Sequence, residues 1–161
     1  MSTLEVKAIQ APTGFDLQMP AGHIVQVVQS TTKTQSTQTS TSWGACGLSA
    51  SITPTNASNK IYIAANVPAL FLDTGGHTGR YTVFRGTTSG TNLGDGSAGF
   101  SLVGNSGNNI YYDCSFNYLD SPSTTSSQTY TIAMRTEHSN SAIYFCSGGT
   151  KAVLTLMEVS G

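Results

Sequence analysis

The sequence has few charges, no long apolar run and no regular cysteine spacing. Only 9% of its 161 residues are charged and the net charge is −1, so the chain has no field that would attract nucleic acid or anionic lipid. No apolar stretch is long enough to span a bilayer, and the N-terminus lacks the basic-then-apolar order of a secretory signal. These absences favour a protein that folds in the cytoplasm and binds neither nucleic acid nor membrane.

The three cysteines Cys46, Cys114 and Cys146 are odd in number, widely spaced and without a CxxC pair. This spacing argues against a disulfide framework and against a zinc knuckle. We interpret them as buried, reduced thiols that act as small apolar side chains.

The length suits one domain, and serine and threonine fill about a quarter of it. Period-2 alternation recurs along the chain, and turn clusters of Gly, Pro, Asn, Asp and Ser separate the alternating runs. In NIYYDCSFNYL, for example, Cys114 and Phe116 share one face with three further apolar residues, while Asp113 and Ser115 lie on the other. The pattern predicts an all-β antiparallel sandwich that resembles a jelly roll. Besides this run, strands are expected near residues 23–29, 45–53, 60–67, 80–86, 99–103, 128–136, 141–147 and 150–159.

Two runs fit this scheme less simply. TTKTQSTQTSTS, residues 31–42, contains six threonines but no glycine or proline, which favours a polar strand over a slack linker. Because an uncharged strand at a sheet edge invites pairing, we expect a neighbouring strand or another subunit to cover it. AVLTLMEV, residues 152–159, is largely apolar on both faces, which indicates a central strand or a subunit interface.

Residues 1–22 are predicted to form a separate anchor and assembly segment, and residues 23–161 the β-sandwich knob. Prolines and glycines in APTGFDLQMPAG separate the two parts. So short a segment cannot bury its own apolar side chains, and homotrimerisation is one solution. The anchor residues would be Leu4, Val6, Ile9, Phe15 and Leu17.

No motif identifies a reaction. GDGSAG, residues 94–99, matches a dinucleotide fingerprint in letters, but no helix pattern follows it, so we expect a loop. The pair Asp113 and Asp120 has nothing nearby to raise a pKa for glycoside hydrolysis, and the histidines lack metal-ligand spacing. We therefore expect a non-enzymatic protein with no cofactor and no metal site.

Aromatic and cationic residues on a polar β surface can stack on sugar rings or hold carboxylated glycans. Such residues can equally be ordinary strand residues and partners between strands, and the sequence leaves both interpretations open. As candidate ligand-binding residues we take Trp43, His77, Arg80 and Tyr111.

Four stretches resemble pieces of the terminal domain of tail fibres from marine and cyanobacterial bacteriophages. They are STLEVKAIQAPTG, MPAGHIVQVVQ, GLSASITPTNASNKIYI and TLMEVSG, in that order along the chain, and residues 70–127 match nothing comparable. The resemblance implies a virion protein with a β-rich, homotrimeric knob whose loops meet a bacterial surface glycan or protein.

The leading hypothesis is accordingly a short tail fibre or receptor-binding tip that adheres to the host cell. Its partners would be further copies of itself, other virion proteins of the tail hub, baseplate or capsid, and a host glycan or protein. The alternatives are a capsid decoration, head-fibre or cement protein and, further off, a glycan hydrolase. The capsid alternative arises because the segment before the knob is too short for an extended shaft.

Overall fold

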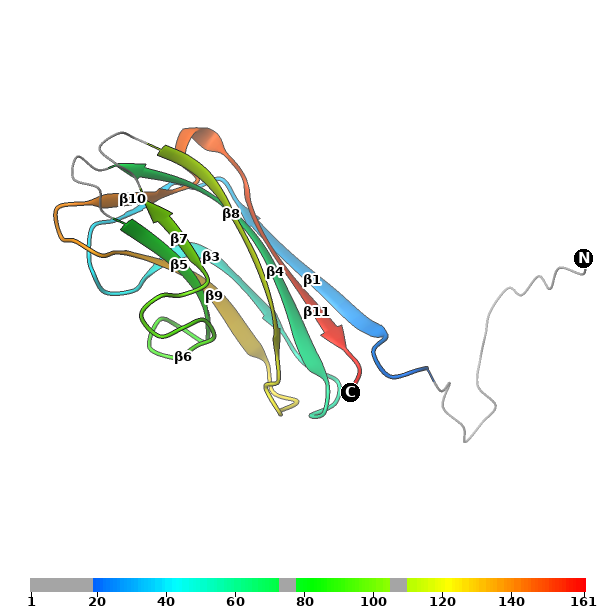
Figure 1. Ribbon diagram of the computed structural model, residues 1–161. Helices are drawn as coiled ribbons and strands as arrows, with labels where there is room; N and C mark the ends of the chain where they lie inside the picture. The colour runs from blue at the N-terminus through cyan, green and yellow to red at the C-terminus, as the bar shows by residue number, and fades with distance from the viewer. Residues whose placement is uncertain (1–18, 73–77, 105–109) are drawn as a thin grey trace, which may run out of the picture.

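The computed structural model describes residues 19–72, 78–104 and 110–161, and within them two antiparallel β-sheets face each other (Figure 1). The first sheet contains β1 (Ile24–Thr32), β2 (Ser36–Gln38), β4 (Lys60–Leu72), β8 (Ile110–Asp120), β10 (Ala142–Phe145) and β11 (Ala152–Val159). The second contains β3 (Gly44–Ile52), β5 (Thr78–Arg85), β6 (Thr91–Asn92), β7 (Ser101–Gly104) and β9 (Gln128–Thr136). A 3₁₀ turn, η1 (Ser147–Gly149), lies between β10 and β11.

Each sheet is effectively four strands wide. In the first, β8 pairs with one edge of β4, while β11 and β10 pair in succession along its other edge and are flanked by β1 and β2. In the second, the order is β3, β9, β5, and then β6 and β7 side by side along β5. If β1 and β2 are counted as one strand, and likewise β6 with β7 and β10 with β11, the sandwich has eight strands in chain order. Their orders in the two sheets, 1-8-3-6 and 2-7-4-5, are those of a jelly roll. The predicted fold class is confirmed.

The core fills the space between the sheets. Alternate residues of each strand point inward, as in β3, where Cys46, Leu48, Ala50 and Ile52 are all buried. The hydroxyl of Tyr81 crosses the core and donates to the backbone oxygen of Tyr144, 3.1 Å away. All three cysteines are buried and free, as predicted, and burial raises the pKa of each thiol.

The stretch 31–42 is only partly a strand, so the prediction of one continuous strand was wrong. It contributes the end of β1 and the three residues of β2, which β10 covers from within the same sheet. Between and after these strands, polar side chains bond the local backbone: the Thr32 hydroxyl accepts from the Thr34 N–H, and the Gln38 amide oxygen accepts from the N–H groups of Thr39 and Ser40. Such side-chain bonds compete with the ladder bonds of a strand, which explains the interruptions.

Two other predicted strands have the expected faces. On β8, Cys114 and Phe116 point inward and are buried, but Tyr112 and Tyr118 on the same face remain partly exposed because β8 lies at the sheet edge. β11 occupies the predicted central position between β1 and β4, with one face fully buried and the other half-buried.

The buried face of β11 ends in a carboxylate, Glu158, which is 0% exposed. Its Oε1 accepts from the Thr55 backbone N–H at 2.7 Å, the Thr55 hydroxyl at 2.7 Å and the Asn59 amide at 2.6 Å. Its Oε2 accepts from the Gln26 amide at 2.6 Å. Burial raises the pKa of Glu158, but these hydrogen bonds to Asn59, Gln26 and Thr55 outweigh it and lower the pKa to about 2.

The predicted anchor cannot be compared with this fold, because Leu4, Val6, Ile9, Phe15 and Leu17 lie outside the described residues. The proposed boundary between residues 22 and 23 therefore stays a prediction. Within the part of the chain that the structure describes, no helix is long and apolar enough to cross a membrane.

Candidate functional site

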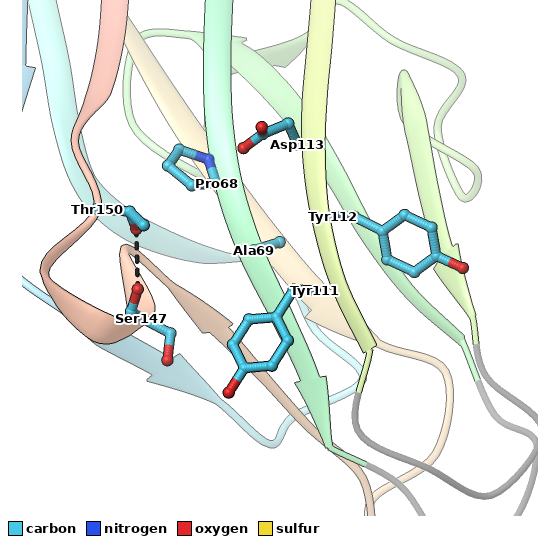
Figure 2. Close-up of a pocket in the computed structure, with 7 residues that line it drawn as sticks. All are labelled: Pro68, Ala69, Tyr111, Tyr112, Asp113, Ser147 and Thr150. Atoms are coloured by element: carbon cyan, nitrogen blue, oxygen red, sulfur yellow. Dashed lines mark hydrogen bonds between the residues drawn. The ribbon is translucent and has the colours of Figure 1, made fainter.

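A shallow pocket of about 250 Å³ opens on the outer face of the first sheet, where β4 ends and β8 begins (Figure 2). Strand β8 brings Tyr111 and Asp113 to it, and the turn after β10 forms the opposite wall. The lining residues are Pro68, Ala69, Tyr111, Tyr112, Asp113, Ser147 and Thr150.

Pro68 explains why a pocket forms at this point of the sheet. Proline has no N–H to donate, so a proline inside a central strand leaves a gap in the ladder. The neighbouring strand leaves β4 here: β10 pairs as far as Ala69 and β11 resumes pairing at Asn66. The Pro68 oxygen is still satisfied, because it accepts from the backbone N–H of Cys146 at 3.0 Å.

The chain that leaves the sheet folds into the tight turn around η1. Cys146 has φ 54° and ψ 37°, and Gly148 and Gly149 have φ of 69° and 78°, so three left-handed residues turn the backbone outward. The Thr150 hydroxyl donates to the Ser147 oxygen at 2.9 Å and closes the turn (Figure 2). The result is a wall that presents hydroxyl groups to the pocket.

The opposite side of the pocket is aromatic and acidic. Tyr111 pairs with Leu70 across the sheet and Asp113 pairs with Pro68, so both side chains project from the outer face. Tyr111 is 72% exposed, the highest value among the exposed large hydrophobic residues of the described chain. Its hydroxyl has the freedom to bond a ligand, whereas the hydroxyl of Tyr112 already donates to the Gly104 oxygen at 3.2 Å.

This combination suits a neutral, hydroxyl-rich ligand. An exposed aromatic ring offers a flat apolar face for the C–H groups of a sugar, and a carboxylate accepts hydrogen bonds from neighbouring hydroxyls. None of the described lining residues is cationic, so none of them would favour a phosphate or a carboxylate. Among the described residues, no cluster of His, Cys, Asp and Glu could hold a metal ion.

Of the four predicted ligand-binding residues, only Tyr111 is seen to line this pocket. Trp43 instead belongs to a contact within the second sheet: the Arg135 guanidinium lies 5.3 Å from its ring centre, and its indole N–H donates to the Gly96 oxygen at 3.2 Å. Arg135 also donates to the backbone oxygens of Ser97 and Thr41. These contacts pin the glycine-rich loop 94–99, which is followed by a strand and not by a helix, as the sequence predicted.

The side chain of Arg80 is occupied in a similar way. It forms an ion pair with Glu137 at 2.6 Å and donates to the Ala98 oxygen at 3.3 Å. Glu137 also accepts from the Thr78 hydroxyl, and this hydrogen bond, with the pairing to Arg80, lowers its pKa. Because Trp43 and Arg80 both have partners within the chain, we leave them out of the site. His77 lies outside the described residues.

The carboxylates of Asp113 and Asp120 point to opposite faces of β8. Asp113 is exposed at the outer surface, whereas Asp120 is buried and accepts from the Tyr130 hydroxyl at 2.7 Å and from Arg85 at 3.2 Å. They do not form the facing pair that glycoside hydrolysis uses.

Sequence reasoning missed Pro68, Ser147 and Thr150. The signal for Pro68 was present, since a proline inside an alternating run marks a break in the ladder. The other two residues are far from it in sequence and meet it only through the pairing of β10 with β4.

Comparison with known proteins gives a fold likeness only. No protein-family model matches the chain, and no curated protein matches it. Two similar solved structures are the infectious bursal disease virus VP2 subviral particle, at TM-score 0.46 and 12% identity, and the T=1 particles derived from infectious bursal virus, at 0.43 and 13%. They cover 96% and 97% of this chain, which spans only 44% and 41% of theirs. Similarity at this level says nothing about function.

Proposed function

We propose that this protein is a non-enzymatic structural protein of a bacteriophage virion, acting as a short tail fibre or receptor-binding tip that adheres to the host surface. The first support is the resemblance of four stretches to the terminal domains of phage tail fibres. The fold is compatible with this role, because jelly rolls serve as capsid and lectin domains, although fold alone does not fix function.

The three of these stretches that lie in the described residues meet at one end of the sandwich. MPAGHIVQVVQ supplies β1, TLMEVSG supplies the end of β11, and GLSASITPTNASNKIYI supplies β3, the following turn and the start of β4. Glu158 joins them, because its donors Gln26, Thr55 and Asn59 come from the other two stretches. The resembling pieces thus form one hydrogen-bonded unit.

The observation that carries the proposal is the position of the pocket at the other end. The chain enters the sandwich beside its C-terminus, where the Gly22 N–H donates to the Ser160 oxygen at 3.0 Å (Figure 1). Strand β4 runs from this end at Lys60 to the pocket end at Leu72, a length of about 40 Å at about 3.3 Å per residue. A protein attached through its N-terminal segment would therefore present the Tyr111 pocket outward.

Binding through so shallow a pocket would be weak for one copy. A homotrimer, which is part of this proposal, would hold three such sites rigidly, and avidity on a repetitive surface can exceed the single-site affinity by a factor of about 10² to 10⁴. Adhesion would then depend on the number of copies more than on any single contact.

The test is binding of the labelled full-length protein to an array of bacterial surface polysaccharides. Tyr111→Ala should reduce binding to the recognised glycan at least tenfold, because it removes the aromatic face. Asn117→Ala is the matched control, since Asn117 is an exposed residue on the same outer face of β8, opposite Ala64 and away from the pocket. Equal binding by Tyr111→Ala and wild type, or no binding by wild type to any bacterial glycan, would overturn the pocket's role.

A further inference from the structure

The outer face of the first sheet carries a row of apolar residues across all four strands. Val27 on β1 lies opposite Met157 on β11, which lies opposite Tyr62 on β4, which in turn lies opposite Leu119 on β8. All four point away from the core. With strands about 4.8 Å apart, the row is about 14 Å long.

A second apolar pair lies beside this row, nearer the end where the chain enters. Ile24 on β1 lies opposite Val159 on β11. In the other direction the face becomes polar at once, since the next row contains Gln29, Thr155 and Asn117. We call Ile24, Val27, Tyr62, Leu119, Met157 and Val159 the entry-end patch.

The entry-end patch is open to solvent. Ile24 and Val27 are each 55% exposed and Leu119 is 45% exposed. Because only 9% of the residues are charged, few charged side chains offset this apolar surface. A contiguous apolar surface on a soluble protein usually marks a contact site. Strand β1 also pairs only with β11 in the described part of the chain, so its outer edge offers free backbone groups.

The described chain begins beside this patch. Residues 20–23 form a β-turn, in which the His23 N–H donates to the Pro20 oxygen at 3.4 Å and Gly22 has φ 86°. The turn therefore holds Met19 and Pro20, the first described residues, close to the start of β1, where the patch lies. The turn is fixed to β11 by a second bond, between the Ser160 hydroxyl and the His23 ring at 2.9 Å.

The segment before this turn is rich in large apolar side chains, and some of them alternate with polar ones: Leu4, Val6, Ile9, Phe15 and Leu17. An extended chain from Met19 back to Phe15 spans about 14 Å. Phe15 can therefore reach Val27 or Val159 but cannot reach the pocket, which begins about 26 Å away along β4, at Pro68. The chain from Met19 back to Leu4 can extend to about 50 Å, so Leu4 can reach Leu119 at the far end of the row.

We infer that residues 1–18 dock on the entry-end patch of their own copy, with Phe15 and Leu17 beside Ile24 and Val27. The docked segment covers the apolar row and the free edge of β1. The sandwich then presents two different ends: one closed by its own N-terminal segment, and one open at the Tyr111 pocket. This inference does not depend on the proposed function.

The experiment uses the full chain with Phe15 replaced by the photo-crosslinking residue p-benzoylphenylalanine. It is unfolded in urea with an equal amount of uniformly ¹⁵N-labelled protein and the two are refolded together, so that any oligomer contains both kinds of copy. After illumination, mass spectrometry should find position 15 joined to peptides that contain Val27, Met157 or Val159, all of them unlabelled. Val27→Ser should lower the cross-link yield at least threefold. Gln29→Ser is the matched control, because Gln29 is the next residue after Val27 on the outer face of β1 and lies outside the patch; it should leave the yield unchanged.

Met157→Ser, opposite Val27 on β11, is a second test on another strand, should Val27→Ser disturb β1. Cross-links to the ¹⁵N-labelled copy would overturn docking within one copy and indicate exchange between subunits. Cross-links to residues outside the patch, or none at all, would overturn the inference as a whole. So would a yield that neither patch variant changes.

Discussion

Replacing Glu158 with glutamine should remove a large, pH-dependent part of the stability of the sandwich. The carboxylate accepts four hydrogen bonds, and an amide can offer only one oxygen to these donors. If the glutamine oxygen keeps the hydrogen bonds from Thr55 and Asn59, its NH₂ group faces the NH₂ group of Gln26, so that two donors meet. Gln26 could turn its own oxygen toward it, but would then lose its bond to the Thr53 oxygen, now 2.8 Å.

The size of the effect follows from the pKa of Glu158. A decrease from 4.5 to about 2 on folding corresponds to about 3 kcal/mol of stability at neutral pH. Because the folded-state pKa lies below the unfolded one, this contribution is complete above about pH 5 and disappears as the pH falls through about 2. Glu158→Gln should therefore be less stable by about 2–4 kcal/mol at pH 7, and the difference should shrink steadily towards pH 2.

The assay is urea unfolding at fixed protein concentration between pH 2.5 and 7, followed by the fluorescence of Trp43, the single tryptophan. Glu137→Gln is the control: Glu137 is also hydrogen-bonded, but its side chain is 30% exposed, so the loss should stay below about 1 kcal/mol. A difference between wild type and Glu158→Gln that is the same at pH 7 and pH 2.5 would refute this reasoning, since it would show that the charge plays no part.

Two further predictions test the loop and the core. Gly99→Ala should destabilise the protein by more than about 2 kcal/mol in urea unfolding, because Gly99 has φ 68° and an added Cβ would lie 2.4 Å from the Tyr81 oxygen; Gly96→Ala, where nothing lies within 4 Å, should cost less than about 1 kcal/mol. Comparable losses in both would contradict the contact. The three thiols should not react with a disulfide reagent at pH 8 in the native protein and should all react in concentrated guanidinium, because each is buried with a raised pKa. Rapid native reaction of even one thiol would contradict its burial.

Much of the fold could be read from local alternation, because a period of two directly fixes which side chains share a face. Cys114 and Phe116 are on the buried face of β8 for this reason, and Tyr111 is on the exposed one. The same reasoning overestimated the stretch 31–42, where threonine and glutamine side chains bond the backbone and replace ladder bonds.

The Glu158 network and the walls of the pocket could not be read in the same way. A single carboxylate in phase with Ala152, Leu154 and Leu156 is a visible anomaly, but its partner Gln26 is at the other end of the chain. The contact between Trp43 and Arg135 likewise joins β9 to the segment before β3. Such sets are fixed by strand order, which alternation within one strand does not encode.

The position of the protein on the virion tests the central claim most directly. Virions carrying this protein would be labelled with an antibody against it and viewed by electron microscopy, with Tyr111→Ala virions scored in parallel for adsorption to host cells. We predict label at the tail tip and an adsorption rate that falls at least tenfold in the variant. Label over the capsid would contradict the receptor-binding tip and favour a decoration protein, and no label at all would contradict a virion role.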